Sequence, residues 1–275
     1  MYKITTNITK GIVGRLKSSK SSNKYDLSWL QRKVLKHQDD TSIKEYKFAN
    51  FRIFYRRPYE LLHTYQELFE KELYRFKANT DTPRIIDCGA NIGLSIIYFK
   101  ILYKQAYIEA FEPDERNFEL LSKNCNSNQL QLVTLHQAAV WTYNGTISFA
   151  ANESEASHIS ENVVSSNVEV RCVSLKDVLQ KYSKVDFLKI DIEGAEWNVI
   201  QNISNELNKV EHLFLEYHGK TIETQKLSEL LNILKNSGFS VYIRNAADNL
   251  KYPFLQKSIN DAYEVQLNIF CYRNQ

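Results

Sequence analysis

Residues 84–95 have the sequence RIIDCGANIGLS, and this stretch decides the fold that we expect for the chain. An apolar run closed by Asp-Cys-Gly and followed by a second glycine and another apolar run predicts a buried strand, a tight turn and a helix. Gly89 and Gly93 allow the backbone to approach a ligand closely, and Asn91 readily adopts a positive φ. The stretch therefore predicts a nucleotide-type crevice at the carboxyl end of a parallel strand.

The spacing of the glycines disfavours pyrophosphate as the ligand. The dinucleotide fingerprint G-x-G-x-x-G, started at Gly89, would need glycines where Asn91 and Leu94 stand. Glu112 follows the turn by about 20 residues, at the end of the next predicted strand, where a carboxylate can accept both hydroxyls of a ribose. Asp87 and Glu112 together predict adenosine, although each alone is also typical of a residue that merely ends a strand.

A second group of polar residues follows two further apolar runs. The run 185–190 predicts a buried strand that ends at Asp191, beside the first strand. The run 212–218 predicts the next strand, and its alternation places Glu216 and His218 on one face. In an open α/β sheet the carboxyl ends of the strands carry the chemistry, so we expect a reaction centre here.

Three motifs resemble those of the FkbM-type methyltransferases, a branch of the S-adenosylmethionine-dependent enzymes. They are IDCGANIG at 86–93, FEP at 111–113 and, most specifically, KIDIEGAE at 189–196. The resemblance covers roughly residues 47–244. It implies adenosylmethionine as the cofactor and O-methylation of a hydroxyl on a sugar, a surface glycan or a secondary metabolite.

The candidate cofactor contacts lie in the three motifs, with one addition. That addition is Ala139, which only the resemblance implies, in the loop expected against the adenine. The full candidate set is Asp87, Gly89, Asn91, Gly93, Glu112, Pro113, Ala139 and Asp191.

Methyl transfer to a hydroxyl requires a group that orients the hydroxyl and removes its proton. Asp191 is the first candidate, and His218 is an alternative base because imidazole titrates near neutral pH. Glu193 completes the candidate catalytic set. In the structural alternative, Asp191 caps the following helix, Glu196 pairs with a lysine and His218 is only a hydrogen-bonded residue of the fold.

A divalent metal is a further alternative at these strand ends. Asp191, Glu193, Glu216 and His218 could hold Mg²⁺ or another ion that lowers the pKa of the acceptor. Because such clusters are common without metal, we assign no metal ligand. N-methylation of an amine, and a binding module that has lost turnover, also stay open.

Alternating strand and helix patterns around the motifs predict an α/β fold with a mostly parallel, seven-stranded sheet and helices on both faces. This is the Rossmann-like class I methyltransferase fold that the resemblance implies. Residues 239–243 and 263–272 predict an antiparallel hairpin at one edge. Asn144-Gly145 predicts a second hairpin turn, between 140–141 and 146–149.

We expect a methyltransferase domain at 80–275 and, at 1–79, an N-terminal arm, strand and helix packed on it. Residues 10–24 have the composition of a solvated arm. Residues 25–35 predict a short amphipathic helix with Leu27, Leu30, Val34 and Leu35 on one face. Residues 59–76 predict one longer helix. The polar segment 150–167 is either a substrate loop or a surface excursion.

Composition excludes several classes of protein. The chain has 275 residues, 43% hydrophobic and 24% charged, which is ordinary for a globular protein, and its net charge of +3 is too small to imply nucleic acid. No run approaches the ~18 apolar residues of a membrane span. The first residues lack the apolar core of a secretory signal, which indicates the cytoplasm. Four widely spaced cysteines indicate reduced thiols. The sequence does not decide the oligomeric state.

Overall fold

The computed structural model describes residues 25–150, 158–159, 167–250, 252–255 and 263–273. The chain forms two compact units, one of Met1–Ser42 with Arg56–Leu73 and one of Ile43–Tyr55 with Tyr74–Gln275. All strands of the described ranges belong to the second, larger unit. The functional division expected at residue 80 stays a prediction, because compactness alone does not assign activity.

A seven-stranded sheet forms the centre of the larger unit, in the order β12-β13-β11-β10-β3-β4-β5. β11, β10, β3, β4 and β5 are parallel to one another, whereas β13 is antiparallel to both β11 and β12. The predicted fold class, with its antiparallel edge pair, is confirmed. The bounds are β3 Arg84–Cys88, β4 Tyr107–Phe111, β5 Val133–His136, β10 Val185–Ile190, β11 Val210–Gly219, β12 Ser240–Asn245 and β13 Val265–Tyr272.

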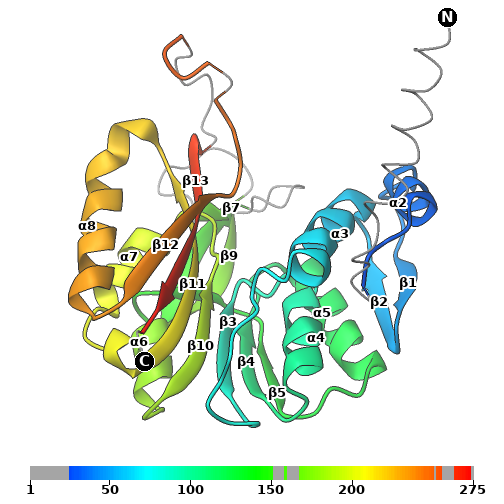
Figure 1. The fold of residues 1–275 in the computed structure, drawn as a ribbon, viewed down its shortest axis with the longest axis horizontal. Coiled ribbons are helices and arrows are strands. Elements are labelled where there is room, and N and C mark those ends of the chain that lie inside the picture. The colour runs from blue at the N-terminus through cyan, green and yellow to red at the C-terminus, as the bar shows by residue number, and fades with distance from the viewer. Residues whose placement is uncertain (1–24, 151–157, 160–166, 251, 256–262, 274–275) are drawn as a thin grey trace, which may run out of the picture. The chain divides into compact units, whose positions relative to one another are not determined.

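Helices cover both faces of this sheet, with α6, α7 and α8 on one face and α4 and α5 on the other (Figure 1). Asp114 and Ser174 cap α5 and α6, each accepting a hydrogen bond from the backbone three residues on. The bounds are α4 Leu94–Leu102, α5 Glu115–Ser127, α6 Leu175–Gln180, α7 Glu196–Asn202, η2 Leu207–Lys209, η3 Thr221–Glu223 and α8 Thr224–Asn236.

β10 is the central strand of the seven-stranded sheet and is buried along its whole length. Burial on both faces explains its nearly continuous apolar sequence. Asp186 and Lys189 interrupt that sequence, and a buried charge requires a partner. Lys189 finds its partners in the candidate site described below.

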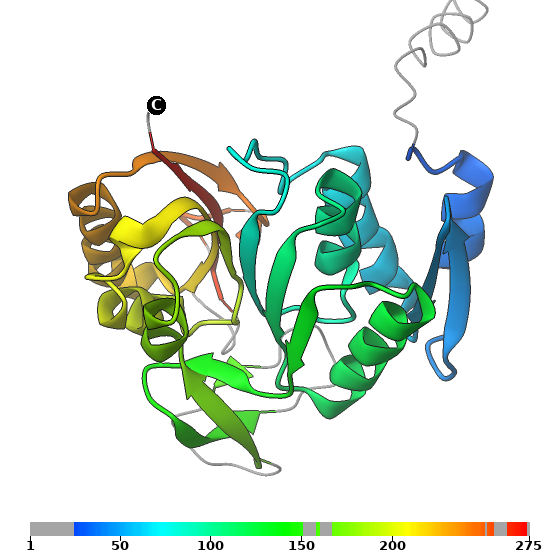
Figure 2. The ribbon, with the colours of Figure 1, turned by 90° about the horizontal axis from the view of Figure 1, so that it is seen from below.

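A separate four-stranded sheet has the order β6-β9-β7-β8 (Figure 2). Its strands are β6 Ala139–Trp141, β7 Gly145–Ala150, β8 His158–Ile159 and β9 Asn167–Ser174. The predicted hairpin at Asn144-Gly145 is wrong, because β9 lies between β6 and β7 and pairs with both. Asn144 instead accepts a hydrogen bond from the backbone of Ser174 (3.0 Å) and donates one to Asp177 (2.5 Å), which ties it to the start of α6.

A two-stranded hairpin of β1 (Lys44–Phe48) and β2 (Phe51–Tyr55) belongs to the larger unit. Asn124 of α5, fully buried, hydrogen-bonds both the N–H and the C=O of Phe54, at 2.6 and 3.0 Å. The same amide donates to the carbonyl of Ile92 at 2.8 Å. One side chain thus connects the hairpin to the glycine turn.

The smaller unit contains α2 (Trp29–Lys36), α3 (Pro58–Tyr65) and η1 (Gln66–Glu70). Ser28 and Gln31 form a capping box at the start of α2. Leu27 and Leu35 are buried as predicted, but Leu30 and Val34 are 63% and 54% exposed, so the predicted apolar face is only half correct.

The single helix predicted over 59–76 is wrong in its last six residues, 71–76. Helical structure ends at Glu70, and Glu72 has a positive φ of 52°. Beyond it, Tyr74 and Phe76 pack in an aromatic cluster of the larger unit, with ring centroids 4.7 Å from Phe214 and 4.8 Å from Phe187. Tertiary burial of these rings overrides the helical spacing.

Other predictions concern residues outside the described ranges. They include the solvated arm at 10–24 and most of the polar segment 150–167. Within the described ranges, every helix is too short or too polar to cross a membrane.

Candidate active site at the carboxyl ends of the central strands

The candidate site lies where β4, β3 and β10 end, and these three strands are neighbours in the sheet. The backbone of Gly89 and of Ala90 donates to the carbonyl of Phe111, at 3.0 and 2.9 Å, and Asp191 donates to that of Cys88 at 3.1 Å. These bonds hold the loops together beyond the strand ends. The sequence-predicted tips therefore meet at one end of the sheet.

The turn after β3 requires glycine for conformation and for space. Gly89, Asn91 and Gly93 have φ values of 85°, 48° and 87°. A Cβ on Gly89 would lie 1.9 Å from the carbonyl oxygen of Asp191, a backbone atom that cannot turn aside. The backbone of the turn therefore lies directly against the loop that follows β10.

Glu112 connects the end of β4 to this turn. Its two oxygens accept hydrogen bonds from the backbone of Asn91 (2.8 Å) and of Asp114 (3.0 Å). Burial raises the pKa of Glu112 to about 7, although the two backbone donors act in the opposite direction. Each carboxylate oxygen keeps a further lone pair for another donor.

Lys189 joins the acidic residues beneath the turn. Its ammonium lies 3.4 Å from Asp87 Oδ1 and 3.4 Å from Asp191 Oδ2, and it donates to the carbonyl of Gly89 at 2.5 Å. Burial lowers the pKa of Lys189, but the charges of Asp191 and Asp87 outweigh it and hold that pKa well above its ordinary value. Lys189 thus stays charged in the core.

Asp87 is fully buried and lies under the turn. Its Oδ2 accepts the hydroxyl of Ser95 at 2.5 Å, which fixes the first turn of α4. The structure therefore shows Asp87 organising the loop through Ser95 and Lys189, and its predicted contact with a cofactor stays a prediction.

β11 brings His218 and Glu216 to the other side of Asp191. His218 Nδ1 lies 3.2 Å from Glu196 Oε1, and its Nε2 lies 3.4 Å from Glu193 Oε2 and 3.6 Å from Glu216 Oε1. Burial lowers the pKa of His218, but Glu196, Glu193 and Asp191 outweigh it and raise that pKa to about 10. Glu196 pairs with this histidine rather than with a lysine.

The turn between β10 and α7 has an unusual backbone. Glu193 and Gly194 have φ values of 54° and 98°. Tyr263 donates its hydroxyl to the carbonyl of Glu193 at 2.7 Å, and its ring centroid lies 5.2 Å from that of His218. These contacts fix Glu193 beside the imidazole. Asp191, Glu193 and His218 thereby offer one ligand atom each within 4.8 Å of one another.

Lys189, Glu196 and Tyr263 are site residues to which the sequence analysis gave no site role. A lysine inside a buried apolar strand is a usable signal, because such a charge requires an acidic partner. Tyr263 gives no local signal, since its contact with Glu193 spans 70 positions.

Two other predicted cofactor contacts lie apart from this network of charges. Pro113 is half-buried between Glu112 and Asp114. Ala139 is buried in β6 and packs with Ile147 and Cys172 in a small apolar cluster of the four-stranded sheet. Their contacts with a cofactor stay predictions.

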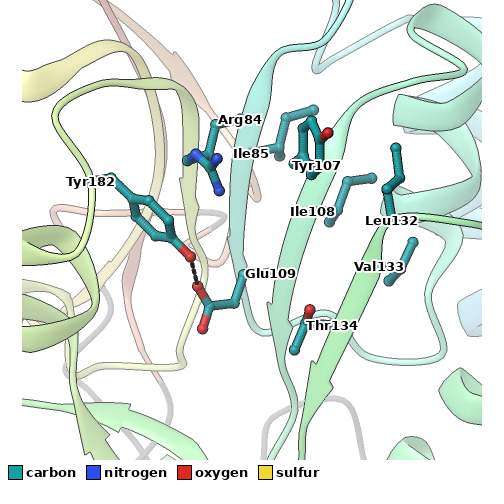
Figure 3. A pocket seen from close by; sticks show the side chains of 9 residues that line it. All are labelled: Arg84, Ile85, Tyr107, Ile108, Glu109, Leu132, Val133, Thr134 and Tyr182. Carbon is teal, nitrogen blue, oxygen red and sulfur yellow. Dashed lines mark hydrogen bonds between the residues drawn. The ribbon is translucent and has the colours of Figure 1, made fainter.

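A cavity of about 270 Å³ lies elsewhere, at the opposite end of the strands (Figure 3). Its lining includes Arg84, Tyr107 and Val133, the first residues of β3, β4 and β5. Tyr182 donates its hydroxyl to Glu109 at 2.6 Å, and the guanidinium of Arg84 lies 4.2 Å from the Tyr182 ring centroid. This cavity is distinct from the site at the carboxyl ends.

Comparisons with known proteins give a consistent result. The family model described as "Methyltransferase FkbM domain" matches residues 87–241, which include all of the strand tips above. The chain is 30% identical over 177 residues to methyltransferase sdnD of Sordaria araneosa, with 52% of this chain and 68% of that protein covered. It is 24% identical over 153 residues to hexuronic acid methyltransferase AglP of Haloferax volcanii, with 55% of this chain and 62% of that protein covered.

Among solved structures, methyltransferase FkbM from Methylobacillus flagellatus KT aligns with a TM-score of 0.47 and 19% identity. The alignment covers 74% of this chain and 46% of that chain, so this chain spans less than half of the solved one.

Proposed function

Because the chain belongs to the FkbM methyltransferase family, we propose that it transfers the methyl group of S-adenosylmethionine to a hydroxyl of a sugar, a surface glycan or a secondary metabolite. One observation carries the proposal: the glycine turn, Glu112 and Asp191 converge at adjacent strand ends. A sugar acceptor also agrees with one relative, which is a hexuronic acid methyltransferase.

The residues of the turn fit an adenosyl group. Glu112 is buried, and its oxygens retain acceptor capacity for the two ribose hydroxyls. Gly89 and Gly93 present backbone without side chains. The buried Asp87 Oδ1 lies 3.4 Å from the Lys189 ammonium, so the charge under the turn is balanced within the protein. When bound, adenosylmethionine supplies a methyl group on a sulfonium whose sulfur keeps the electron pair of the broken bond.

Asp191 is the residue best placed to orient the acceptor hydroxyl and to take its proton. Its side chain is 25% exposed, whereas that of His218 is 2% exposed. Lys189 lies 3.4 Å from the Asp191 carboxylate and holds it at the mouth of the turn. A general base must reach the proton that it removes, so accessibility favours Asp191 over His218.

Glu193 and His218 complete the proposed catalytic set on the acceptor side. The imidazole is held through Nδ1 by Glu196, and Glu193 is held through its main chain by Tyr263. The imidazole and the main chain of Glu193 therefore have fixed positions next to Asp191, which favours orientation of an acceptor.

Calorimetry with S-adenosylmethionine, followed by a methyl-release assay on hydroxylated and aminated acceptors, tests the proposal. We expect cofactor binding and methyl transfer to at least one hydroxylated acceptor. Transfer to amines alone would replace the proposal by N-methylation. Binding without transfer to any acceptor would indicate a module that has lost turnover.

A further inference from the structure

Asp191, Glu193 and His218 bring two carboxylates and one imidazole together from adjacent strand ends. One ligand atom of each lies within 4.8 Å of the others, and β10 and β11 are parallel neighbours. Carboxylate oxygens are the ligands that Mg²⁺ prefers, and an imidazole nitrogen extends the set to ions such as Mn²⁺, with the proton of Nε2 released to solvent when the cation binds. The set thus has the composition and the spacing of a divalent cation site.

A separate observation concerns the far side of the imidazole. His218 Nδ1 lies 3.2 Å from Glu196, and the two side chains are 2% and 0% exposed. Histidines that bind metals commonly have a carboxylate at the other ring nitrogen, which fixes the tautomer and the direction of the ligating nitrogen. The Glu196–His218 pair has this arrangement.

Glu196 is itself fixed by the turn that carries the other ligands. It accepts hydrogen bonds from the backbone of Ile192 (3.2 Å) and of Gly194 (3.0 Å). A single buried carboxylate therefore positions both the imidazole and the loop between Asp191 and Glu196.

The contacts of Nε2 are compatible with an ion between the groups. Nε2 lies 3.4 Å from Glu193 and 3.6 Å from Glu216, longer than the ~2.7–2.9 Å of a charge-assisted hydrogen bond. Glu193 is held in a left-handed conformation, at a φ of 54°, by the hydroxyl of Tyr263. Its carboxylate thereby stays beside Nε2, with Glu216 as a neighbouring oxygen donor.

We propose that Asp191, Glu193 and His218 bind a divalent cation of the Mg²⁺ or Mn²⁺ class. The role of the cation rests on the proposed function: it binds the acceptor oxygen and makes the acceptor hydroxyl more acidic. One oxygen of each carboxylate is enough for the cation, so the second oxygen of Asp191 receives the hydroxyl proton. The cation also draws the acceptor to the side of Asp191 that faces β11.

The test is Mn²⁺ binding to the full chain after treatment with EDTA, measured by calorimetry and by electron paramagnetic resonance without cofactor or acceptor. We expect one strong site, weakened at least ~10-fold in Glu193→Gln and in His218→Gln. Glu193→Gln is the primary variant because its side chain is 23% exposed, whereas His218→Gln also disturbs the buried Glu196.

The matched control is Glu109→Gln, which alters a close pair of a glutamate and a histidine away from the site, with His136 Nε2 2.8 Å from Glu109 Oε1. This variant should keep the Mn²⁺ affinity. Absence of stoichiometric binding in the unaltered chain, or unchanged affinity in a folded Glu193→Gln variant, would overturn the proposal.

The cation site and the proposed function fail in different ways. Mn²⁺ binding that Glu193→Gln weakens, together with no methyl transfer to any acceptor, would keep the site and overturn the function. Methyl transfer that persists at full rate in EDTA would overturn the role of the cation in the reaction and keep the function.

Discussion

Two buried glutamates at the two ends of the central strands, Glu109 and Glu112, have pKa values that are shifted in opposite directions. At the carboxyl end, burial raises the pKa of Glu112 to about 7. Toward the amino end, burial also raises the pKa of Glu109, but His136 and Tyr182 outweigh it and lower that pKa. The Glu109 carboxylate is held by two side chains, whereas the Glu112 carboxyl is held by two backbone donors.

The largest expected effect comes from Gly89→Ala, at the carboxyl end. The added methyl group would lie 1.9 Å from the carbonyl oxygen of Asp191, at a φ of 85°. Strain and overpacking together should lower the free energy of unfolding by about 3 kcal/mol or more. Urea unfolding measures it.

Gly145→Ala is the control, because its new Cβ would meet the Tyr143 ring at 3.5 Å, an ordinary contact. Equal unfolding midpoints for the two variants would show that the two loops at the carboxyl end are not in contact.

Asp191→Asn tests whether turnover depends on the carboxyl ends of the strands. The variant should lose at least ~100-fold in turnover and keep a near-normal affinity for the cofactor, because an amide cannot take the hydroxyl proton. Tyr182→Phe, at the amino end, should keep full turnover. A steady-state methyl-release assay measures both, and full rate in Asp191→Asn would remove it as the base.

Much of this comparison could be predicted from the sequence. The strand tips Asp87, Glu112 and Asp191 converge because each apolar run with its helix is a local pattern, and right-handed crossovers align the strands. The prediction of a hairpin at Asn144-Gly145 was wrong because pairing with the distant β9 outweighs a local turn preference. In the same way, packing of Tyr74 and Phe76 in the larger unit explains why the helix predicted over 59–76 ends at Glu70.

Sequence patterns could not predict the contact between Glu196 and His218 for a related reason. The contact between Glu196 and His218 joins residues that are 22 positions apart, one at the start of α7 and the other near the end of β11. Alternation placed His218 on the correct face, but the partner of its ring depends on how the β10 loop turns. That turn is set by the positive φ of Glu193, and a glutamate gives no signal for it.

Glu112→Ala should weaken binding of the cofactor by about 1–3 kcal/mol, the range for hydrogen bonds to a charged group. Glu109→Ala, on the same segment of chain, should leave that affinity unchanged. Calorimetry with S-adenosylmethionine compares them directly. Equal affinities in both variants would remove Glu112 from the cofactor site.

The smallest expected effect is the dependence of stability on pH. The folded state holds the proton of Glu112 more tightly than the unfolded chain, because its pKa is raised from 4.5 to about 7. Stability should therefore fall as pH rises through this range and level off above about 7. Between about pH 6 and about pH 8 the loss is on the order of 1 kcal/mol.

Glu112→Gln has no titrating group at this position, so the difference in unfolding free energy between the wild type and this variant should change by that amount over the same interval. A difference that is constant with pH would show that the Glu112 carboxyl is not desolvated.

A crystal structure with S-adenosylhomocysteine, the demethylated cofactor, tests the central claim most directly. We predict that the ribose hydroxyls lie within hydrogen-bond distance of Glu112 and that the adenosyl group lies against the turn from Gly89 to Gly93. A ligand bound instead in the cavity lined by Arg84, Tyr107 and Tyr182 would contradict the account.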